Sequence, residues 1–366
     1  RKTRRSRMSA SDRPLRVAIA GCHRMLDRVG QSHNWAAAFD AVPDTEIVGV
    51  FDYGDETRRE FKAAWGDHIP DFNDYPRMLE AVDPDIVCIA TRQTMHADQC
   101  EQAVAAGARG VFFEKPLCTT MEEVDRIVNA CEANGVGVVY GLDRAWWPPY
   151  VHLAKLLADG LIGEVQAVFG FGLAQLLNHG CHWLDVMLTL AGHPEPTWAA
   201  GYVNDVSSLP ADARDRLDPP GRGMFGWGEN KFAHVMREGA PSHAYEVLGT
   251  DGRLLVTNDA SDALVWRVRE GFGFLGREGL AAEPLELPDR GGLADAGRVA
   301  VGDLAAAIRD GRPSICGLDR ARLVTELGFA FHESHLQGGA RVALPLQERN
   351  VRVPSYEWGN EAPAAE

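Results

Sequence analysis

The sequence lacks any run of about 18 apolar residues, the length that a membrane-spanning helix requires, so a transmembrane protein is not expected. It also lacks a C-x-x-C pair. Its seven cysteines are scattered, mostly in apolar runs, and predict reduced thiols in a cytoplasmic protein. Polar residues follow the Arg4-Arg5 pair, where a twin-arginine export signal needs an apolar segment. We therefore expect neither a membrane anchor nor export.

An excess of positive charge is also missing. The chain has 37 Lys and Arg against 52 Asp and Glu, a net charge of −15, and five of the basic residues lie in the first seven positions. Such an acidic body repels phosphate backbones and anionic lipid, so nucleic acid and membrane surfaces are poor partners. A small neutral molecule fits better. The 366 residues predict two domains at about 150 residues each.

The first domain is predicted from an alternation of short β-branched runs with amphipathic segments. Because the runs are apolar almost throughout, they indicate strands buried on both faces, as in a doubly wound parallel α/β sheet of the Rossmann type. The expected strands are 16–20, 47–51, 86–90, 111–113 and 136–140, and the expected helices are 56–65, 97–106 and 121–133.

The pattern changes after Gly141. Strand signals such as 164–169 alternate between apolar and polar residues, which favours an open, mostly antiparallel sheet in an α+β domain. Helices are expected at 148–159 and 318–335, and 203–231 is predicted to be a long loop or hairpin excursion that shapes substrate choice. The expected divisions are a disordered basic tail at 1–13, a dinucleotide-binding domain at 14–141, a substrate and oligomerisation domain at 142–355, and a C-terminal tail at 356–366.

A glycine directly follows the first expected strand, as in a turn that binds a dinucleotide pyrophosphate. The G-x-G-x-x-G pattern is absent, because His23 holds the second glycine position and Gly30 comes about four residues late. Asp52, after the second strand, suits the ribose hydroxyls of NAD and would repel the 2′-phosphate of NADP. Arg58 and Arg59 favour NADP, and an ordinary strand-end turn is the alternative for Asp52.

Two further segments contain residues suited to proton transfer. Lys115, in Glu114-Lys115-Pro116, follows the fourth expected strand, where a positive nicotinamide would favour loss of its proton. The alternative is a surface Glu-Lys pair. His182 and Asp185 are three residues apart on a predicted helix, and a histidine suits removal of a hydroxyl proton as hydride departs. A core histidine is one alternative. A metal site with His179 is the other, disfavoured because all three ligands lie in one turn; we expect no metal.

Several motifs in order resemble the glucose–fructose oxidoreductase/inositol dehydrogenase (Gfo/Idh/MocA) family. They span about residues 15 to 346: Gly21, 91–96, Glu114-Lys115-Pro116, Gly141-Leu142-Asp143-Arg144, Gly180-x-His182-x-x-Asp185, 247–254 and His332-Glu333-Ser334. The resemblance implies a Rossmann domain, a C-terminal α+β domain whose open sheet forms a homodimer or homotetramer, and an active site between the domains. It also implies NAD(P)-dependent oxidation or reduction of sugars and polyols.

By this resemblance Lys115 holds and polarises the reacting hydroxyl, and His182 is its acid or base. The expected cofactor residues are Gly21, His23, Arg24, Met25, Asp52, Thr91, His96, Glu114 and Lys115, and the expected substrate residues are Arg144, Trp146, Asn178, His179 and Asp185. Two departures stand out. Asn178 occupies a position where many members have Asp, which weakens His182 as a base unless Asp185 replaces that carboxylate. The altered glycine loop either weakens pyrophosphate binding or reaches over the cofactor with His23 and Arg24.

The function predicted from these residues is an NAD-dependent oxidoreductase that acts on a secondary hydroxyl or ketone of a sugar, cyclitol or sugar derivative, with NADP as the less favoured cofactor. Two alternatives stay open. One is an NAD-retaining glycosidase or lyase that uses transient oxidation. The other is a non-catalytic protein of the same fold that senses NAD or sugar.

Overall fold

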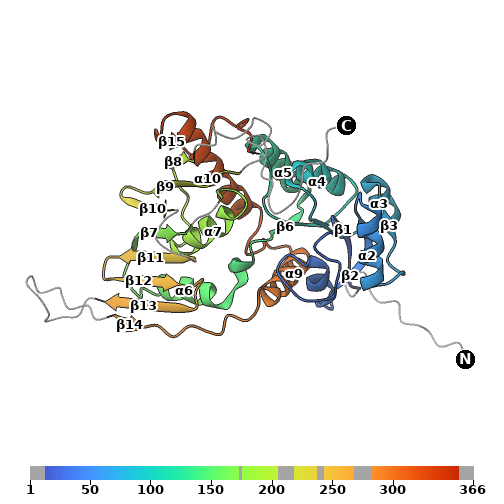
Figure 1. Cartoon of the computed structure of the whole chain (residues 1–366), viewed down its shortest axis with the longest axis horizontal. Helices are drawn as coiled ribbons and strands as arrows, with labels where there is room; N and C mark the ends of the chain where they lie inside the picture. Colours follow the sequence, from blue (N-terminus) through green and yellow to red (C-terminus); the bar gives the residue numbers. More distant parts are fainter. Residues whose placement is uncertain (1–12, 173–174, 205–217, 237–242, 268–281, 354–366) are drawn as a thin grey trace, which may run out of the picture. The chain divides into compact units, whose positions relative to one another are not determined.

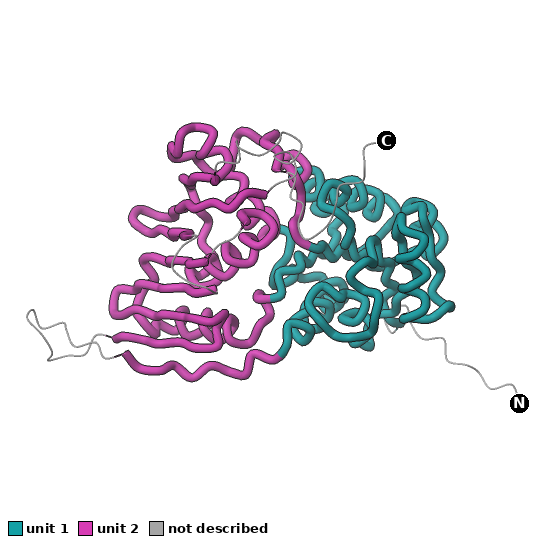
Figure 2. The backbone as a smooth tube through the Cα atoms, in the orientation of Figure 1, with its two compact units in different colours: residues 1–114, 125–143, 292–318 teal, residues 115–124, 144–291, 319–366 magenta. Residues whose placement is uncertain are grey.

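The structure is a computed structural model that describes residues 13–172, 175–204, 218–236, 243–267 and 282–353. The expected tail at 356–366 and nearly all of the tail at 1–13 lie outside these residues. The chain divides into two compact units, which Figure 2 colours separately. Unit 1 comprises Arg1–Glu114, Asp125–Asp143 and Gly292–Leu318, and unit 2 comprises Lys115–Val124, Arg144–Gly291 and Asp319–Glu366.

Unit 1 contains a six-stranded parallel sheet in the order β3-β2-β1-β4-β5-β6, which confirms the predicted Rossmann domain. Its strands are β1 (Leu15–Ala20), β2 (Thr45–Phe51), β3 (Asp71–Phe72), β4 (Ile86–Ile89), β5 (Gly110–Phe113) and β6 (Gly137–Tyr140). The α-helices are α1 (Trp35–Asp40), α2 (Asp55–Trp65), α3 (Tyr75–Val82), α4 (His96–Ala105), α5 (Met121–Asn134) and α9 (Leu293–Asp310), most of which are labelled in Figure 1, and the 3-10 helices are η1 (Gln93–Met95) and η2 (Asp143–Trp146). The boundary with unit 2 falls within α5 and η2. The sequence patterns had not indicated β3, α1, α3 or α9.

The position of α9 differs from the predicted domain boundary, which assigned residues after 141 to the second domain. This helix packs on α1 and on strands β5 and β6. Gly110 and Gly137 begin those strands, and a Cβ on either would meet the Ile308 side chain, at 2.5 Å and 3.4 Å respectively. The two glycines therefore leave room for α9, and residues 292–318 complete the core of unit 1.

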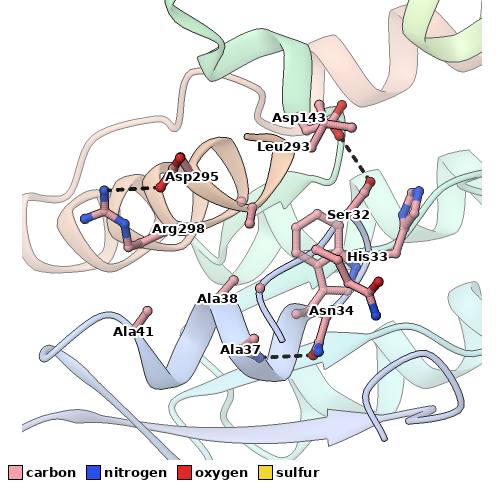
Figure 3. Close-up of a pocket in the computed structure, with 15 residues that line it drawn as sticks. Ser32, His33, Asn34, Ala37, Ala38, Ala41, Asp143, Leu293, Asp295 and Arg298 are labelled. Carbon is pink, nitrogen blue, oxygen red and sulfur yellow. Dashed lines mark hydrogen bonds and ion pairs between the residues drawn. The ribbon is translucent and has the colours of Figure 1, made fainter. Parts of the chain in front are cut away.

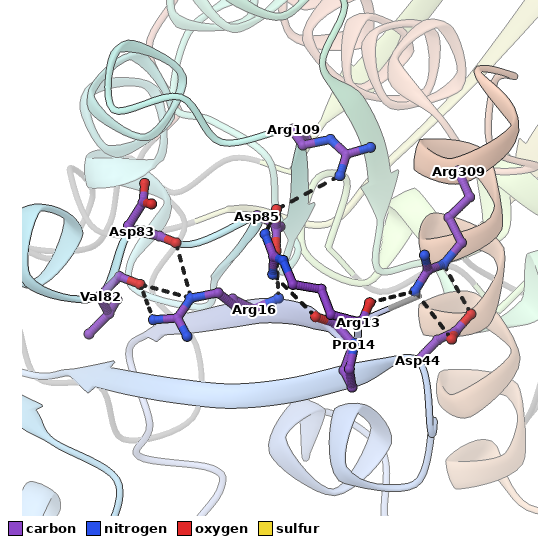
Figure 4. Close-up of polar contacts among 9 residues, drawn as sticks. All are labelled: Arg13, Pro14, Arg16, Asp44, Val82, Asp83, Asp85, Arg109 and Arg309. Atoms are coloured by element: carbon purple, nitrogen blue, oxygen red, sulfur yellow. Dashed lines mark hydrogen bonds and ion pairs between the residues drawn. The ribbon is translucent and has the colours of Figure 1, made fainter. Parts of the chain in front are cut away.

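A network of arginines and aspartates fixes the start of β1 in unit 1 (Figure 4). Asp85 accepts hydrogen bonds from Arg13 at 2.6 Å and from the backbone N–H of Arg16 at 2.9 Å. Burial alone would raise the pKa of Asp85, but the Arg13 hydrogen bond, the Arg16 N–H and the charges of Arg13 and Arg109 lower it below its ordinary value. Asp85 thereby holds the chain entering β1 against the chain entering β4.

Unit 2 is a nine-stranded sheet in the order β14-β13-β12-β11-β7-β10-β9-β8-β15, antiparallel except for the β7–β10 pair, as the mostly antiparallel prediction required. Its strands are β7 (Val165–Phe171), β8 (Trp198–Val203), β9 (Gly221–Trp227), β10 (Lys231–Met236), β11 (Ala244–Gly249), β12 (Gly252–Thr257), β13 (Asp262–Arg267), β14 (Glu283–Pro284) and β15 (Val342–Ala343). Its helices are α6 (Pro148–Ala158), α7 (Gly180–Leu190) and α10 (Leu318–Leu336). Strand β9 lies within the segment 203–231 that was predicted as a loop or hairpin excursion, and 205–217 lie outside the described residues.

Candidate active site

The carboxyl edge of the unit 1 sheet brings together residues from four strands. Gly21 follows β1, Asp52 follows β2, Thr91 lies two residues beyond β4 and Glu114 follows β5. The strand order reverses between β1 and β4, and ligands of such sheets bind at the carboxyl ends beside that switch point. The structure therefore places these predicted cofactor residues at one edge of one sheet.

Gly21 and Asp52 form a closed turn at this edge. Gly21 has a φ of +85°, and a Cβ there would lie 2.5 Å from the Ala90 carbonyl oxygen, so only glycine fits. The Asp52 carboxylate accepts the backbone N–H of Cys22 at 3.0 Å and that of Gly54 at 2.9 Å. A half-exposed carboxylate fixed beside a glycine turn has the chemistry to accept hydrogen bonds from ribose hydroxyls. These residues thus fit a dinucleotide.

Arg58 bears on the choice between NAD and NADP. Its guanidinium forms ion pairs with Asp55 and, at 3.1 Å, with Asp71, and it donates to the carbonyl oxygen of Asp52 at 2.6 Å. The residue is 8% exposed. Because these partners occupy the guanidinium, Arg58 is not presented to a 2′-phosphate, whereas Arg59 is exposed.

The loop between β1 and α1 contains three predicted cofactor residues in different settings. His23 and Arg24 are exposed. Met25 is buried at 1% exposure, and its carbonyl oxygen accepts the Trp65 indole N–H at 2.7 Å. The structure therefore packs the Met25 side chain into unit 1, while His23 and Arg24 are placed where a ligand could reach them.

Glu114 anchors that loop to the end of β5. Its carboxylate, 7% exposed, accepts the Trp35 indole N–H and lies 3.0 Å from His33 Nδ1. Near the end of β4, Thr91 donates its hydroxyl to Gln99, and its carbonyl oxygen lies 3.2 Å from His96 Nε2. Glu114 thus contacts two side chains, His33 and Trp35, that no motif had indicated.

A cavity of about 180 Å³ lies beside this loop within unit 1 (Figure 3). Residues 30–35 of the loop and helix α1 form one side, and the start of α9 forms another. The Ser32 hydroxyl donates to Asp143 at 3.4 Å across it. The lining residues are 30–35, 37, 38, 41, 143, 293–295, 297 and 298. The cavity therefore lies between this loop and Asp143, the first residue of η2.

Lys115, Asn178 and His182 all belong to unit 2. The Lys115 ammonium donates to the Asn178 side-chain oxygen at 2.7 Å. His182 lies in the first turn of α7, four residues after Asn178. Lys115 is 8% exposed, Asn178 4% and His182 5%. A cation and an imidazole thus lie at the start of one helix in a largely desolvated setting, where charge interactions are strong.

Asp185 has a partner that the sequence did not indicate. It is completely buried and forms an ion pair with Arg320 of α10. Arg320 also donates to the Thr189 hydroxyl at 2.6 Å. The carboxylate predicted to assist His182 or to contact substrate therefore ties α7 to α10.

Arg144 is held in a second buried network. It donates to both carboxylate oxygens of Asp259, at 3.0 and 2.5 Å, and the Tyr150 hydroxyl donates to the same carboxylate at 2.8 Å. Burial alone would raise the pKa of Asp259, but the Arg144 hydrogen bonds and charge, together with His243 and Tyr150, lower it below its ordinary value. Arg144 is thus occupied by protein, and Trp146 beside it is 4% exposed.

The turn that supplies Asp259 has an unusual backbone. Asn258, Asp259 and Ala260 have φ values of 51°, 53° and 60°, a left-handed conformation that costs about 1–3 kcal/mol per residue and persists only where the surrounding structure enforces it. The Asp259 N–H donates to the carbonyl oxygen of His243 at 3.0 Å, and the His243 ring stacks on Trp183 of α7 at a centroid distance of 3.6 Å. Burial and the Arg144 charge lower the pKa of His243 to about 4.

The described part of the chain contains neither a group of side chains that could hold a metal ion nor a helix that could cross a membrane. Within it, no three His, Cys, Asp or Glu side chains are grouped closely enough to hold a metal ion. No helix in the same ranges is both long and apolar enough to cross a membrane.

Comparison with known proteins gives sequence matches over the N-terminal part of the chain. Residues 15–142 match the family model described as "Oxidoreductase family, NAD-binding Rossmann fold". Over 158 residues the chain is 26% identical to dTDP-3,4-didehydro-2,6-dideoxy-alpha-D-glucose 3-reductase of Actinomadura kijaniata, and over 157 residues it is 29% identical to inositol 2-dehydrogenase of Salmonella typhimurium. Each match covers 43% of this chain and 45% of the relative, so the chain spans less than half the length of these curated relatives.

Similarity of structure extends further. The crystal structure of an oxidoreductase domain protein from Kribbella flavida superposes with a TM-score of 0.75 and 18% identity, and covers 91% of this chain and 100% of that one. At this identity the likeness concerns the fold, and it includes both units. Residues 15–142 therefore resemble the NAD-binding Rossmann domain of the Gfo/Idh/MocA oxidoreductase family.

Proposed function

We propose that this protein is an NAD-dependent oxidoreductase that transfers a hydride between nicotinamide and a secondary hydroxyl or ketone of a sugar, cyclitol or sugar derivative. The observation that carries the proposal is the 2.7 Å hydrogen bond between Lys115 and Asn178. It fixes the Lys115 cation, two residues along the chain from the last residue of β5, beside the start of the helix that contains His182. The names of the relatives, a sugar reductase and inositol dehydrogenases, support the substrate class.

The proposed chemistry divides between the two side chains. Bound NAD would supply the hydride acceptor or donor. The Lys115 ammonium donates a hydrogen bond to the reacting oxygen and stabilises negative charge on it. His182 accepts the hydroxyl proton when the alcohol is oxidised and returns a proton when the ketone is reduced. Their burial excludes water, which strengthens both interactions.

NAD rather than NADP is the proposed cofactor. Asp52 provides a carboxylate at the position where a ribose diol is held, and it would repel a 2′-phosphate. Arg58, the residue that could have favoured NADP, is paired with Asp55 and Asp71. Gly21, Thr91 and the exposed His23 and Arg24 are the other proposed contacts at this edge.

The cofactor proposal is tested by thermal shift with NAD⁺, NADH, NADP⁺ and NADPH, since a ligand that binds the folded protein raises its melting temperature. We expect shifts with NAD⁺ and NADH and smaller ones with the phosphorylated forms. Replacement of the exposed Arg59 by Ala is expected to leave this order unchanged. A shift with none of the four nucleotides would contradict cofactor binding.

The activity is tested by following nicotinamide absorbance while the protein is mixed with NAD⁺ and a panel of sugars and cyclitols. We expect reduction of NAD⁺ with at least one of them. Two other outcomes would identify different functions. Bond cleavage in a glycoside without added NAD⁺ indicates a lyase or glycosidase that retains its cofactor, and cofactor binding with no turnover indicates a sensor.

A second copy of the chain is the proposed partner of the unit 2 sheet. On one face Val168, Val247, Leu254 and Val265 are all 3% exposed or less. On the other face the cross-strand row from Phe169 through Glu246 and Leu255 to Leu264 is half-exposed and largely apolar. We expect a homodimer or homotetramer by sedimentation, and Leu255→Lys is expected to yield monomers.

The proposed compartment is the cytoplasm. All seven cysteines are buried, and none of them is in a disulfide. Cys100 and Cys131 lie 3.6 Å apart, Sγ to Sγ, without being linked, as expected of a protein kept in a reducing compartment.

A further inference from the structure

Asp218 connects a segment of undefined role to the candidate active site. The segment 203–231 was predicted to influence substrate choice, but its sequence indicated no individual residue. An antiparallel bridge pairs Pro220 with Gln175, which places residue 218 opposite residue 177 in the same register. Asp218 is 4% exposed. The bridge therefore positions the buried Asp218 carboxylate beside the residues that precede helix α7.

The carboxylate is fixed by two consecutive backbone groups. Its Oδ2 accepts the N–H of Leu177 at 2.9 Å and the N–H of Asn178 at 2.7 Å. The side-chain oxygen of Asn178 in turn accepts the Lys115 ammonium at 2.7 Å. Asn178 thus links the Asp218 carboxylate to the Lys115 cation, because its N–H donates to the carboxylate and its side-chain oxygen accepts from the ammonium. All three residues belong to unit 2.

We propose that Asp218 is a positioning residue for Lys115 in the reaction proposed above, on which this inference rests. By holding the backbone of residues 177 and 178, it aims the Asn178 amide oxygen at the ammonium. It also provides the negative charge of this chain of hydrogen bonds, because the amide that contacts Lys115 is neutral. In a buried setting such a charge stabilises the cation far more than it would in water.

A double-mutant cycle measures the connection without requiring turnover. Asp218→Asn keeps a side-chain oxygen that can accept the two N–H groups but removes the charge, and Lys115→Met removes the cation at similar length. We expect Asp218→Asn to lower the melting temperature by about 3 °C in the Lys115 protein and by less than about 1 °C in the Lys115→Met protein. Equal decreases in both backgrounds would overturn the proposal.

Glu326 offers a matched control in the same unit. It is a buried carboxylate that accepts a backbone N–H, from Leu346 at 2.9 Å, and pairs with Arg349 at 2.7 Å. We expect Glu326→Gln to lower the melting temperature by the same amount whether residue 115 is Lys or Met. If the effect of Glu326→Gln on the melting temperature depends on residue 115, then the loss of any buried charge produces such a dependence. This result would overturn the inference.

Turnover distinguishes positioning from a purely structural role. We expect Asp218→Asn to lower kcat roughly tenfold while the KM for NAD⁺ stays within about twofold. Adding Asn178→Asp, which puts a carboxylate directly on Lys115, is expected to restore kcat to within about threefold of wild type. Failure of this rescue would overturn the charge role. If the wild-type protein turns over no polyol, the proposed oxidoreductase function is wrong, and the thermal cycle still decides whether Asp218 and Lys115 are coupled.

Discussion

Units 1 and 2 position their candidate functional residues in different ways. In unit 1, Gly21, Asp52, Thr91 and Glu114 meet because parallel strands end at the same edge of a sheet, so the topology alone brings them together. In unit 2, the contacts depend on specific pairs far apart in sequence: Lys115 with Asn178 across 63 residues, and Arg144 with Asp259 across 115. The arrangement in unit 1 can be predicted from the order of strands in the sequence, whereas the pairs in unit 2 can be found only from the folded structure.

The difference also determines what a substitution does. A residue at the end of a parallel strand keeps its place because the whole sheet holds it, and replacing it removes mainly its own chemistry. A residue in a buried charged pair leaves an unpaired partner when it is removed, so the loss affects stability as well. Variants that separate these effects test the comparison.

The largest expected effect comes from removing the proposed proton-transfer groups. Lys115→Ala and His182→Ala are each expected to lower kcat by roughly 10²–10⁴-fold, the usual contribution of a positioned acid or base. Lys155→Ala serves as the matched control, because that side chain is 73% exposed and pairs only with Asp159 among the ion pairs of the described residues. Steady-state kinetics check the expectation, and unchanged turnover in both active-site variants would make the catalytic assignment wrong.

The next effect concerns stability in unit 2. Asp259→Ala leaves the buried Arg144 guanidinium without its carboxylate, and breaking such a pair typically costs about 3–5 kcal/mol of unfolding free energy. Urea unfolding measures this loss. Asp262→Ala removes an exposed carboxylate from the first residue of β13, just after the same turn, and is expected to change stability by less than about 0.5 kcal/mol. Equal effects of the two substitutions would show that the left-handed turn does not depend on Arg144.

Most of the fold was predictable, and the exceptions have two causes. The strands β1, β2, β4, β5 and β6 were predicted because buried parallel strands are continuously apolar. Strand β3 has two residues and helix α1 six, too few to show a period. Residues 292–318, which include α9, were assigned to the second domain because the contacts of α9 with Gly110 and Gly137 join residues more than 150 positions apart, and no local pattern records them.

The candidate site was predictable in its residue types but not in its contacts. Motifs indicated Lys115, His182 and Asp52, since each follows or begins an expected element. They could not indicate Asp218 or Asp259, because these belong to a loop and a turn whose positions depend on strand register. Asp185 illustrates the limit: its spacing from His182 predicted that the two share a helix face, and nothing in the sequence indicated its ion pair with Arg320.

The pH dependence of stability provides a further test of the buried groups of unit 2. In unit 2, burial lowers the pKa of His193, His243 and His332 to about 4. Between pH 6.5 and about 4 the unfolded chain therefore binds more protons than the folded one, so stability is present above this range and falls as the pH drops through it. His332→Gln is expected to reduce the slope of stability against pH in this range by about one proton, and to leave the slope above pH 7 unchanged. Melting temperatures measured from pH 4 to 8 check this, and an unaltered slope below pH 6.5 would contradict the role of His332.

The smallest expected effect tests whether unit 1 depends on pairs as well as on topology. Glu114 holds the β1–α1 loop through His33 and Trp35, so Glu114→Gln is expected to lower the melting temperature by about 2–3 °C and to weaken NAD⁺ binding by roughly threefold to tenfold. Glu122→Gln, at an exposed position of α5, is the control and is expected to change neither quantity.

Trp35→Phe then separates a loop anchor from a cofactor ligand, because it removes the indole N–H and keeps an aromatic ring. If Glu114 acts through the loop, Trp35→Phe weakens NAD⁺ binding to a similar extent, and titration calorimetry measures both. If Glu114→Gln weakens binding more than about 100-fold while Trp35→Phe has no effect, Glu114 contacts the cofactor itself. The cofactor site of unit 1 would then depend on strand topology alone, and the contacts of Glu114 with the β1–α1 loop would contribute nothing to NAD⁺ binding.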